Sequence, residues 1–176
     1  LKEWDYYYIA NNEFALCLTI SDMGYIGALS LTIMDFVTPA QFTNSAVCLF
    51  PMGKFNMPTT SEKGDCSWKI GKVEMSFTND GTTRHLTGKY PNADKLGTDV
   101  TWDVTLDRVP EESMVIATPF DKPKHFYFNQ KINCMRAQGS FTLGDKVCTF
   151  DAKDSLAALD WGRGVWTYDN TWYWGS

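Results

Sequence analysis

Apolar and polar residues alternate along most of the chain, and Gly, Asn and Asp interrupt the alternation at short intervals. Residues 100–106 show it most clearly, because their Val, Trp and Leu side chains fall on one face of a strand and Thr and Asp on the other. Residues 72–77 and 84–90 flank an Asp-Gly pair, which favours a tight hairpin turn. The pattern predicts an antiparallel all-β domain.

The same pattern predicts the other elements. We expect hairpins from 6–10 with 14–20 and from 140–143 with 147–150, and long strands over 25–36 and 124–137. Residues 154–159 predict a short helix with Asp154 as its N-cap. Residues 51–64 have no period and predict a long loop of the kind that often serves as a binding loop or lid. We therefore expect about ten strands in a single barrel or barrel-like sandwich spanning 1–176.

Length and composition limit the function classes. The 176 residues suffice for one hydrophobic core, and the shares of apolar (44%) and charged (21%) residues argue against disorder. The net charge of −5 lacks the basic footprint of a nucleic-acid binder. Since no apolar run approaches the roughly 18 residues of a membrane span, we expect neither a nucleic-acid partner nor an integral membrane segment.

Cysteine and histidine usage argues against metals and cofactors. Four of the five cysteines, Cys17, Cys48, Cys134 and Cys148, lie in apolar runs, where we expect them to be small buried hydrophobes. Without paired spacing or a glycosylation sequon, the reducing cytoplasm is the expected compartment. The two histidines belong to no metal-binding motif, and the glycines match no nucleotide-binding pattern, so we predict no metal and no cofactor.

A polar row in residues 124–136 is the first candidate site. The period of two places His125, Tyr127, Asn129, Lys131 and Asn133 on one strand face, opposite Phe126, Phe128, Gln130, Ile132 and Cys134. The row is either a solvated outer face or the inside of a barrel, where these groups would be polar handles in an apolar cavity. The density of aromatic residues nearby favours the second interpretation.

The aromatic end of the chain is the second candidate. Read as an extended strand, it places Trp166, Tyr168, Asn170, Trp172 and Trp174 on one face, either as core packing or as a pocket wall. Asp160 and Arg163 are close enough in sequence to form a charge-assisted pair. In a buried mouth that pair would position a substrate or tune a proton donor, whereas on the surface it would only clamp a corner.

These segments carry a resemblance to a known family. Together with residues 49–55, 111–120 and the opening Lys-Glu-Trp-Asp, they resemble uncharacterised bacterial proteins grouped only as a domain of unknown function. The resemblance runs over 1–176 and is most specific at 124–131 and 160–166. Members of that family are longer. The resemblance therefore implies that this chain is about the first half of a two-domain protein, with the C-terminal half as its partner.

A more distant resemblance concerns the closing Gly-Arg-Gly-x-Trp and the later Trp-Gly. They are similar to a motif of the two-domain lipocalin-like group that includes carotenoid hydratase and tocopherol cyclase. The resemblance implies a calycin-type barrel with an internal apolar pocket, in which acid residues protonate or hydrate an alkene of an isoprenoid ligand. Asp160 and Asp169 are the carboxylates within the matching stretch, whereas the group's Asp-His-Glu-Trp form is absent.

Three hypotheses remain open. The first is a binder of an apolar small molecule, such as a lipid or isoprenoid. The second is a lyase or isomerase in which Asp160 or Asp169, with a raised pKa, is the general acid. The third is an interaction domain whose aromatic face packs on the second half or on another copy of the chain. The candidate ligand-binding residues are His125, Tyr127, Asn129, Lys131, Arg163, Trp166, Tyr168, Trp172 and Trp174.

Overall fold

The computed structural model describes residues 1–107, 109–171 and 173–175, and these residues form twelve strands and no helix. The strands are β1 (Lys2–Ala10), β2 (Phe14–Asp22), β3 (Ile26–Asp35), β4 (Ala40–Leu49), β5 (Cys66–Ile70), β6 (Val73–Asn79), β7 (Arg84–Tyr90), β8 (Val100–Asp107), β9 (Met114–Pro119), β10 (Phe126–Leu143), β11 (Lys146–Phe150) and β12 (Leu156–Val165). The predicted all-β class is confirmed. The helix predicted over 154–159 is wrong, because most of that segment begins β12.

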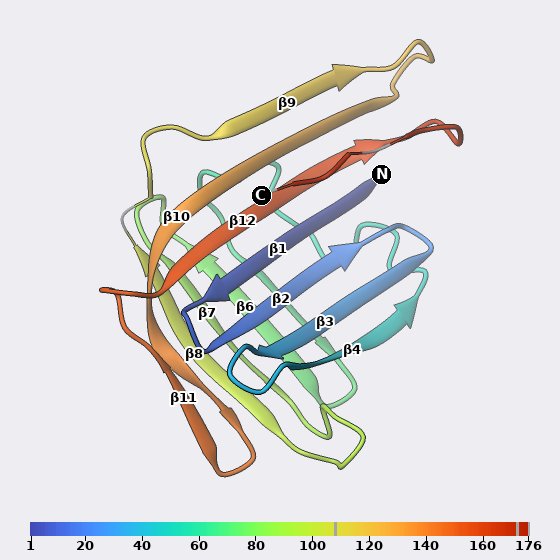
Figure 1. Cartoon of the computed structure of the whole chain (residues 1–176). Coiled ribbons are helices and arrows are strands. Elements are labelled where there is room, and N and C mark those ends of the chain that lie inside the picture. The colour runs from blue at the N-terminus through green and yellow to red at the C-terminus, as the bar shows by residue number, and fades with distance from the viewer. Residues whose placement is uncertain (108, 172, 176) are drawn as a thin grey trace.

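All pairings are antiparallel, and ten strands follow one path in the order β4-β3-β2-β1-β12-β10-β8-β7-β6-β5. The sheet curls so that β6, β7 and β8 lie behind β1 to β4 (Figure 1). The last strand of the path, β5, contacts both β3 and β4, so the barrel is nearly closed. The long β10 pairs with β9 and β12 through its first half and with β8 and β11 through its second.

The interior of the barrel is filled by apolar side chains rather than hollow. Tyr7 of β1, Leu159 and Trp161 of β12 and Phe77 of β6 belong to one buried cluster. The predicted alternation of β8 is confirmed, because its Val, Trp and Leu side chains are buried and its Thr and Asp side chains point away. Each fully buried side chain of this size stabilises the fold by about 1.5–3 kcal/mol. Because apolar side chains fill the interior, we expect a ligand-binding site on the outer face of the sheet.

A β-bulge in β10 changes which side chains face the core. The register with β12 shifts between Ile132 and Met135, both of which are buried, while Asn133 and Cys134 are exposed. Cys134 adopts a φ of 64°, in the left-handed region, which fits the extra residue of a bulge. Buried Cys134 is therefore a wrong expectation, whereas Cys17 and Cys148 are buried as predicted. Cys48 is half-buried.

The long loop predicted over 51–64 is confirmed, since the residues between β4 and β5 contain no strand. It crosses the end of the barrel where β6 ends and β7 begins. Phe55 stacks on Trp68 with a centroid distance of 4.4 Å. The carbonyl oxygen of Ser61 accepts hydrogen bonds from Arg84 Nη2 (2.9 Å) and Asn79 Nδ2 (3.0 Å). Both ends of the loop are thus attached to the barrel.

Candidate functional site

The polar row of β10 lies on the outer face of the sheet. Ile132 belongs to the core and Phe128 packs against it, so Tyr127 and Lys131 must point the other way. The row therefore does not line the barrel interior. It is not a solvated face either, because Asn129 is 0% exposed and Lys131 only 7%.

Strand pairing brings the outer faces of three strands together at this point. Lys131 of β10 is opposite Asp160 of β12, and Asp160 is opposite Tyr6 of β1. Two residues further along β12, Gly162 is opposite both Asn129 and Trp4. The prediction that the aromatic end of the chain forms an extended strand is wrong, because residues 166–171 and 173–175 do not continue β12. Instead they turn over this outer face and cover it.

Asp160 is the centre of the buried polar group. Its Oδ1 accepts hydrogen bonds from Asn129 Nδ2 (2.6 Å) and Trp4 Nε1 (3.3 Å). Its Oδ2 accepts from Trp174 Nε1 (2.6 Å) and from the Lys131 ammonium. Four donors fill the positions that a carboxylate offers.

This environment sets the charge of Asp160. Burial acts to raise the pKa of the carboxyl, but the hydrogen bonds from Lys131, Trp174 and Asn129 outweigh burial, and the pKa is lowered from its usual value. Asp160 is therefore ionised at neutral pH and forms a buried ion pair with Lys131. The raised pKa expected for Asp160 as a general acid is wrong.

An aromatic wall stands beside the ion pair. Trp4 stacks on Tyr127 at a centroid distance of 6.3 Å, and Trp166 packs at 5.6 Å from Trp4 and 5.5 Å from Tyr127. Gly162 makes room for the Trp4 indole, because a Cβ at that position would lie 2.3 Å from a ring carbon. Burial, with a smaller effect of the Asp160 charge, raises the pKa of Tyr127 to about 12, so its hydroxyl stays protonated.

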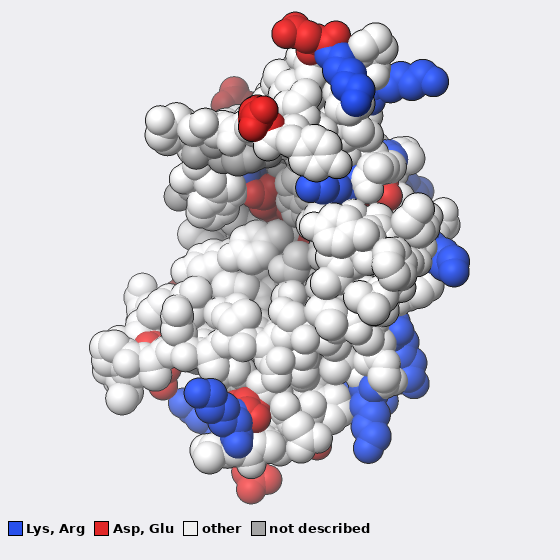
Figure 2. Space-filling view, turned by 90° about the vertical axis from the view of Figure 1, so that its right-hand side faces the viewer, with Lys and Arg blue, Asp and Glu red and all other residues white. Residues whose placement is uncertain are grey.

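A cavity of about 850 Å³ lies between this wall, β9 and the covering segment. Figure 2 shows the molecule from the side, hollowed beneath the tip of the β9–β10 hairpin, with a few charged side chains set among uncharged ones. The cavity is lined by Lys2, Trp4, Met114, Ile116, Thr118, Phe120, Tyr127, Lys131, Asp160, Trp166, Thr167, Tyr168, Asn170, Thr171, Tyr173, Trp174 and Gly175.

The structure brings together five of the residues predicted for the site, namely Tyr127, Lys131, Asp160, Trp166 and Trp174, and Tyr168 lines the rim of the cavity. Asn129 lies beneath the floor and also donates to the Trp161 carbonyl oxygen (2.6 Å). Trp172 lies outside the described residues.

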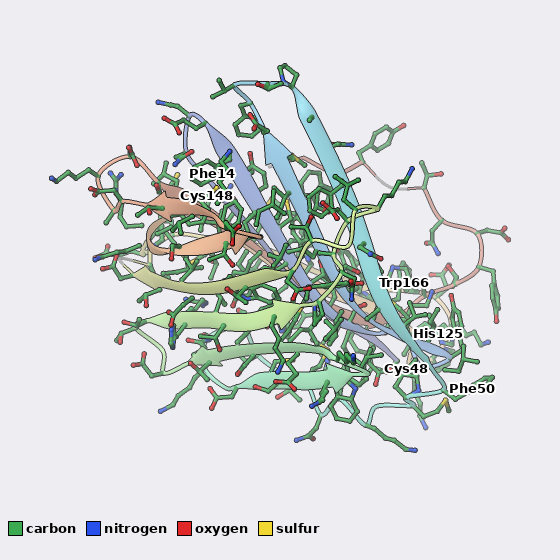
Figure 3. The ribbon with its side chains drawn as sticks, turned by 90° about the horizontal axis from the view of Figure 1, so that it is seen from below. Phe14, Cys48, Phe50, His125, Cys148 and Trp166 are labelled. Carbon is green, nitrogen blue, oxygen red and sulfur yellow. The ribbon has the colours of Figure 1, made fainter. Side chains whose placement is uncertain are left out.

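The other predicted residues lie elsewhere. Arg163 faces the barrel interior, where its Nη2 lies 2.7 Å from Glu3 Oε1. The predicted pair of Asp160 with Arg163 is therefore wrong, because residues three apart on a strand point to opposite faces. His125 lies in the turn before β10, at the same end of the molecule as Trp166 and opposite Phe14 (Figure 3), but outside the cavity lining. Asp169 is exposed and also outside the lining.

Sequence reasoning missed the contributions of β1 and β9. Every second residue of these strands lines the cavity, namely Lys2 and Trp4 of β1 and Met114 and Ile116 of β9. The alternation of Lys2, Trp4 and Tyr6 was a signal, but it did not show that β1 pairs with β12 and so reaches the closing segment.

A second buried polar group lies inside the barrel. Asp5 points into the core from β1, and burial raises the pKa of its carboxyl to about 7, with the Arg84 charge opposing and the Glu3 charge adding to the shift. Arg84 is 2% exposed. These side chains lie beneath the loop that contains Ser61, to which Arg84 donates.

Two negative findings concern the described part of the chain. It contains no grouping of three or more His, Cys, Asp or Glu side chains that is suited to a metal ion. It also contains no helix of the length and apolar character needed to cross a membrane.

Fold and site together define a lipocalin-like antiparallel β-barrel with an aromatic cavity on its outer face. The sequence matches the family described as Domain of unknown function (DUF2804) over residues 1–176, and the chain belongs to this family. No curated protein matches it.

Two solved structures share the fold. Kievitone hydratase from Nectria haematococca is 14% identical, with a TM-score of 0.51 over 93% of this chain and 48% of its own. A putative ATTH from Nitrosomonas europaea is 10% identical, with a TM-score of 0.55 over 96% of this chain and 52% of its own. The chain thus spans about half the length of these structures, and at such identities the likeness concerns the fold alone.

Proposed function

We propose that this protein binds an apolar small molecule, such as a lipid or an isoprenoid, in the cavity on the outer face of β1, β12, β10 and β9. The observation that carries the proposal is the cavity itself, about 850 Å³ in volume and walled by Trp4, Tyr127 and Trp166. Ligand pockets are commonly about 300–1,000 Å³ and mainly apolar, with a few fixed polar groups.

The wall is held in place before any ligand arrives. Asp160 fixes the Trp4 and Trp174 indoles through their Nε1 atoms, and the missing side chain of Gly162 leaves space for Trp4. Because the Asp160 carboxylate already accepts from four donors, an apolar ligand would gain the burial of its surface without leaving that carboxylate unpaired. Such preorganisation lowers the entropy lost on binding.

The test uses N-phenyl-1-naphthylamine, an uncharged probe that fluoresces in apolar surroundings. We expect saturable binding to the wild type and an affinity at least about tenfold lower for Trp166→Ala, since truncation of a central aromatic side chain costs about 2 kcal/mol. Trp68→Ala is the matched control, because Trp68 stacks on Phe55 rather than lining this cavity. Equal affinity in the wild type and Trp166→Ala, or no binding at all, would refute the proposal.

Acid catalysis at this site receives no such support. It requires a protonated carboxyl, whereas Asp160 is ionised and paired with Lys131, and Asp169 is exposed outside the cavity lining. We therefore propose binding rather than alkene hydration or cyclisation.

We also propose that the chain is one barrel of a two-domain protein in the cytoplasm. The two solved structures are about twice as long, and the strongly exposed rings of Tyr168 and Tyr173 at the cavity rim suit packing on a second domain. All five cysteines are unpaired, which fits a reducing compartment.

A further inference from the structure

We infer that the cavity selects an organic acid, and that Lys2 holds the carboxylate of a ligand whose apolar body lies on Trp4 and Tyr127. This inference rests on the proposed function and adds the chemical class of the ligand. It follows from the charges and hydrogen-bond partners of the residues that line the cavity.

The described lining carries two cations and one anion. Lys2 and Lys131 are the cations, and Asp160 is the anion. Asp160 is paired with Lys131, and its two oxygens accept from four donors, so it is not available to a second cation. One positive charge, that of Lys2, is therefore left over in the cavity.

Lys2 has no carboxylate within ion-pair distance among the residues that the structure describes. Its neighbour Glu3 points to the opposite face of β1 and is engaged by Arg163 at 2.7 Å. The Lys2 ammonium lies 5.6 Å from the centroid of the Trp166 ring, a cation–π contact that keeps the charge at the aromatic wall. A ligand carboxylate would thus meet a cation whose position is already set.

The remaining polar groups of the lining are suited to donate as well. Thr118, Thr167 and Thr171 carry hydroxyl groups that can donate to a carboxylate. A cationic ligand would be repelled by the Lys2 charge, and a neutral ligand would gain only uncharged hydrogen bonds from the hydroxyl groups. An anion gains a charge-assisted hydrogen bond from Lys2, in a partly buried place where screening is weak.

The spacing of the two lysines fits an elongated amphipathic acid. Lys2 is opposite Gly164, four residues along β12 from Asp160, the partner of Lys131. Four residues of a strand extend about 13 Å. Trp4, opposite Gly162, lies between these points, whereas Tyr127 is opposite Gly164 and so is level with Lys2. The carboxylate would therefore sit at the Lys2 end beside Tyr127, and the apolar body would run over Trp4 toward the paired Lys131.

The test compares 1-pyrenebutyrate with 1-pyrenebutanol, two fluorescent probes that differ in the charge of one end. We expect the wild type to bind the acid about tenfold more tightly than the alcohol at low ionic strength, and added salt to reduce the difference. Lys2→Met should abolish the preference and change the affinity for the alcohol less than twofold, whereas Lys2→Arg should keep the preference. Lys95→Met is the control for net charge, because Lys95 lies in the loop between β7 and β8, outside the cavity lining.

The outcomes separate the inference from the proposed function. Equal binding of acid and alcohol, with both weakened by Trp166→Ala, overturns the inference and leaves the proposed function standing. A preference for the acid that survives in Lys2→Met also overturns the inference, since the carboxylate would then be held elsewhere. If neither probe binds, or if Trp166→Ala leaves the affinity for both probes unchanged, the proposed function itself is contradicted.

Discussion

At the scale of single residues, the buried pair of Lys131 and Asp160 makes the site sensitive to the loss of either partner. Lys131→Met would leave an ionised carboxylate in a buried place with the two indoles and Asn129 as its only described donors. Breaking such a pair from one side destabilises proteins by about 3–5 kcal/mol. We expect a loss of that order in the free energy of urea unfolding.

The double variant Lys131→Met with Asp160→Leu is the matched comparison, because it removes both charges and keeps apolar volume. We expect it to recover most of the stability lost by Lys131→Met alone. If the single variant unfolds within about 1 kcal/mol of the wild type, the pair is not the stabilising element described here.

Asp5 predicts that the stability of the fold depends on pH, and here the cause is a raised pKa, whereas the pKa of Asp160 is lowered. Burial raises the pKa of its carboxyl from 3.8 to about 7 in the folded protein, so between these values the folded state keeps a proton that the unfolded state has lost. The stability that depends on this proton is fully present below about pH 4 and is lost as the pH rises to about 7. Over pH 5 to 8 the loss is about 2 to 3 kcal/mol.

Asp5→Asn removes this titration. Measured by urea unfolding, the difference in stability between Asp5→Asn and the wild type should therefore shift in favour of the variant from pH 5 to pH 8. Asp121→Asn, at an exposed turn, should show no such shift. A constant difference for Asp5→Asn at both pH values would contradict a protonated Asp5.

At the scale of strands, local pattern predicted well where one face is apolar and the other polar. β8 is such a strand, whereas β12 lies between β1 and β10 and is buried on both faces along much of its length. Its sequence begins Leu-Ala-Ala-Leu, which favours a helix when read alone. Pairing with two neighbouring strands overrides that preference, and no local signal reports the pairing.

The sequence also could not predict which face of β10 meets the core. Large side chains occur on both faces, and the bulge at Asn133 and Cys134 changes the parity of the strand in its middle. A strict period of two cannot include such a shift. The sequence identifies Tyr127 and Lys131 as candidates and favours the barrel interior of the two faces left open for them, whereas the structure places both on the outer face.

The pairing of β10 with β8 predicts one glycine that cannot be replaced. Gly139 has a φ of 131°, and an added Cβ would lie 2.2 Å from the Asp103 carbonyl oxygen. Because that neighbour is backbone of the paired strand, it cannot move aside cheaply. We expect Gly139→Ala to lower the free energy of unfolding by more than about 3 kcal/mol in urea denaturation.

Gly71→Ala is the control for the backbone conformation alone. Gly71 has a φ of 59° with nothing within 4 Å of the added Cβ, so we expect a loss of only about 1 kcal/mol. Equal losses for the two variants would show that the clash at Gly139 is relieved by a shift of the strands.

At the scale of the whole molecule, the filled interior explains why the cavity lies outside the barrel. The core takes one face of every central strand, and only the pairing of β1 with β12 brings Lys2 and Trp4 to the closing segment. This contact joins the two ends of the described chain. The aromatic end predicted Trp166 and Trp174 as wall residues, but its partner strand could not be predicted because long-range pairing leaves no trace in local alternation.

The outer edge of the sheet carries the last prediction. β4 stands at one end of the strand order, no strand among the described residues pairs with its free side, and its ten residues include no charged side chain. Val47 and Leu49 are 52% and 72% exposed. Natural edge strands usually carry Lys, Pro or bulges against unwanted pairing. We expect the chain to associate as its concentration rises, by antiparallel pairing of β4 with β4 of a second copy.

Sedimentation velocity at increasing concentration tests this expectation and decides between two faces of the molecule. Replacing both Val47 and Leu49 by Lys places charges on the edge and should keep the chain monomeric, whereas Trp174→Ala should leave association unchanged. If Trp174→Ala abolishes association and the lysine variant does not, the contact runs through the aromatic cavity face instead. A ligand in the cavity would then compete with association, and saturating N-phenyl-1-naphthylamine should restore the monomer. If β4 is the contact, the same probe should leave the association constant unchanged, because the cavity and the edge lie on different strands.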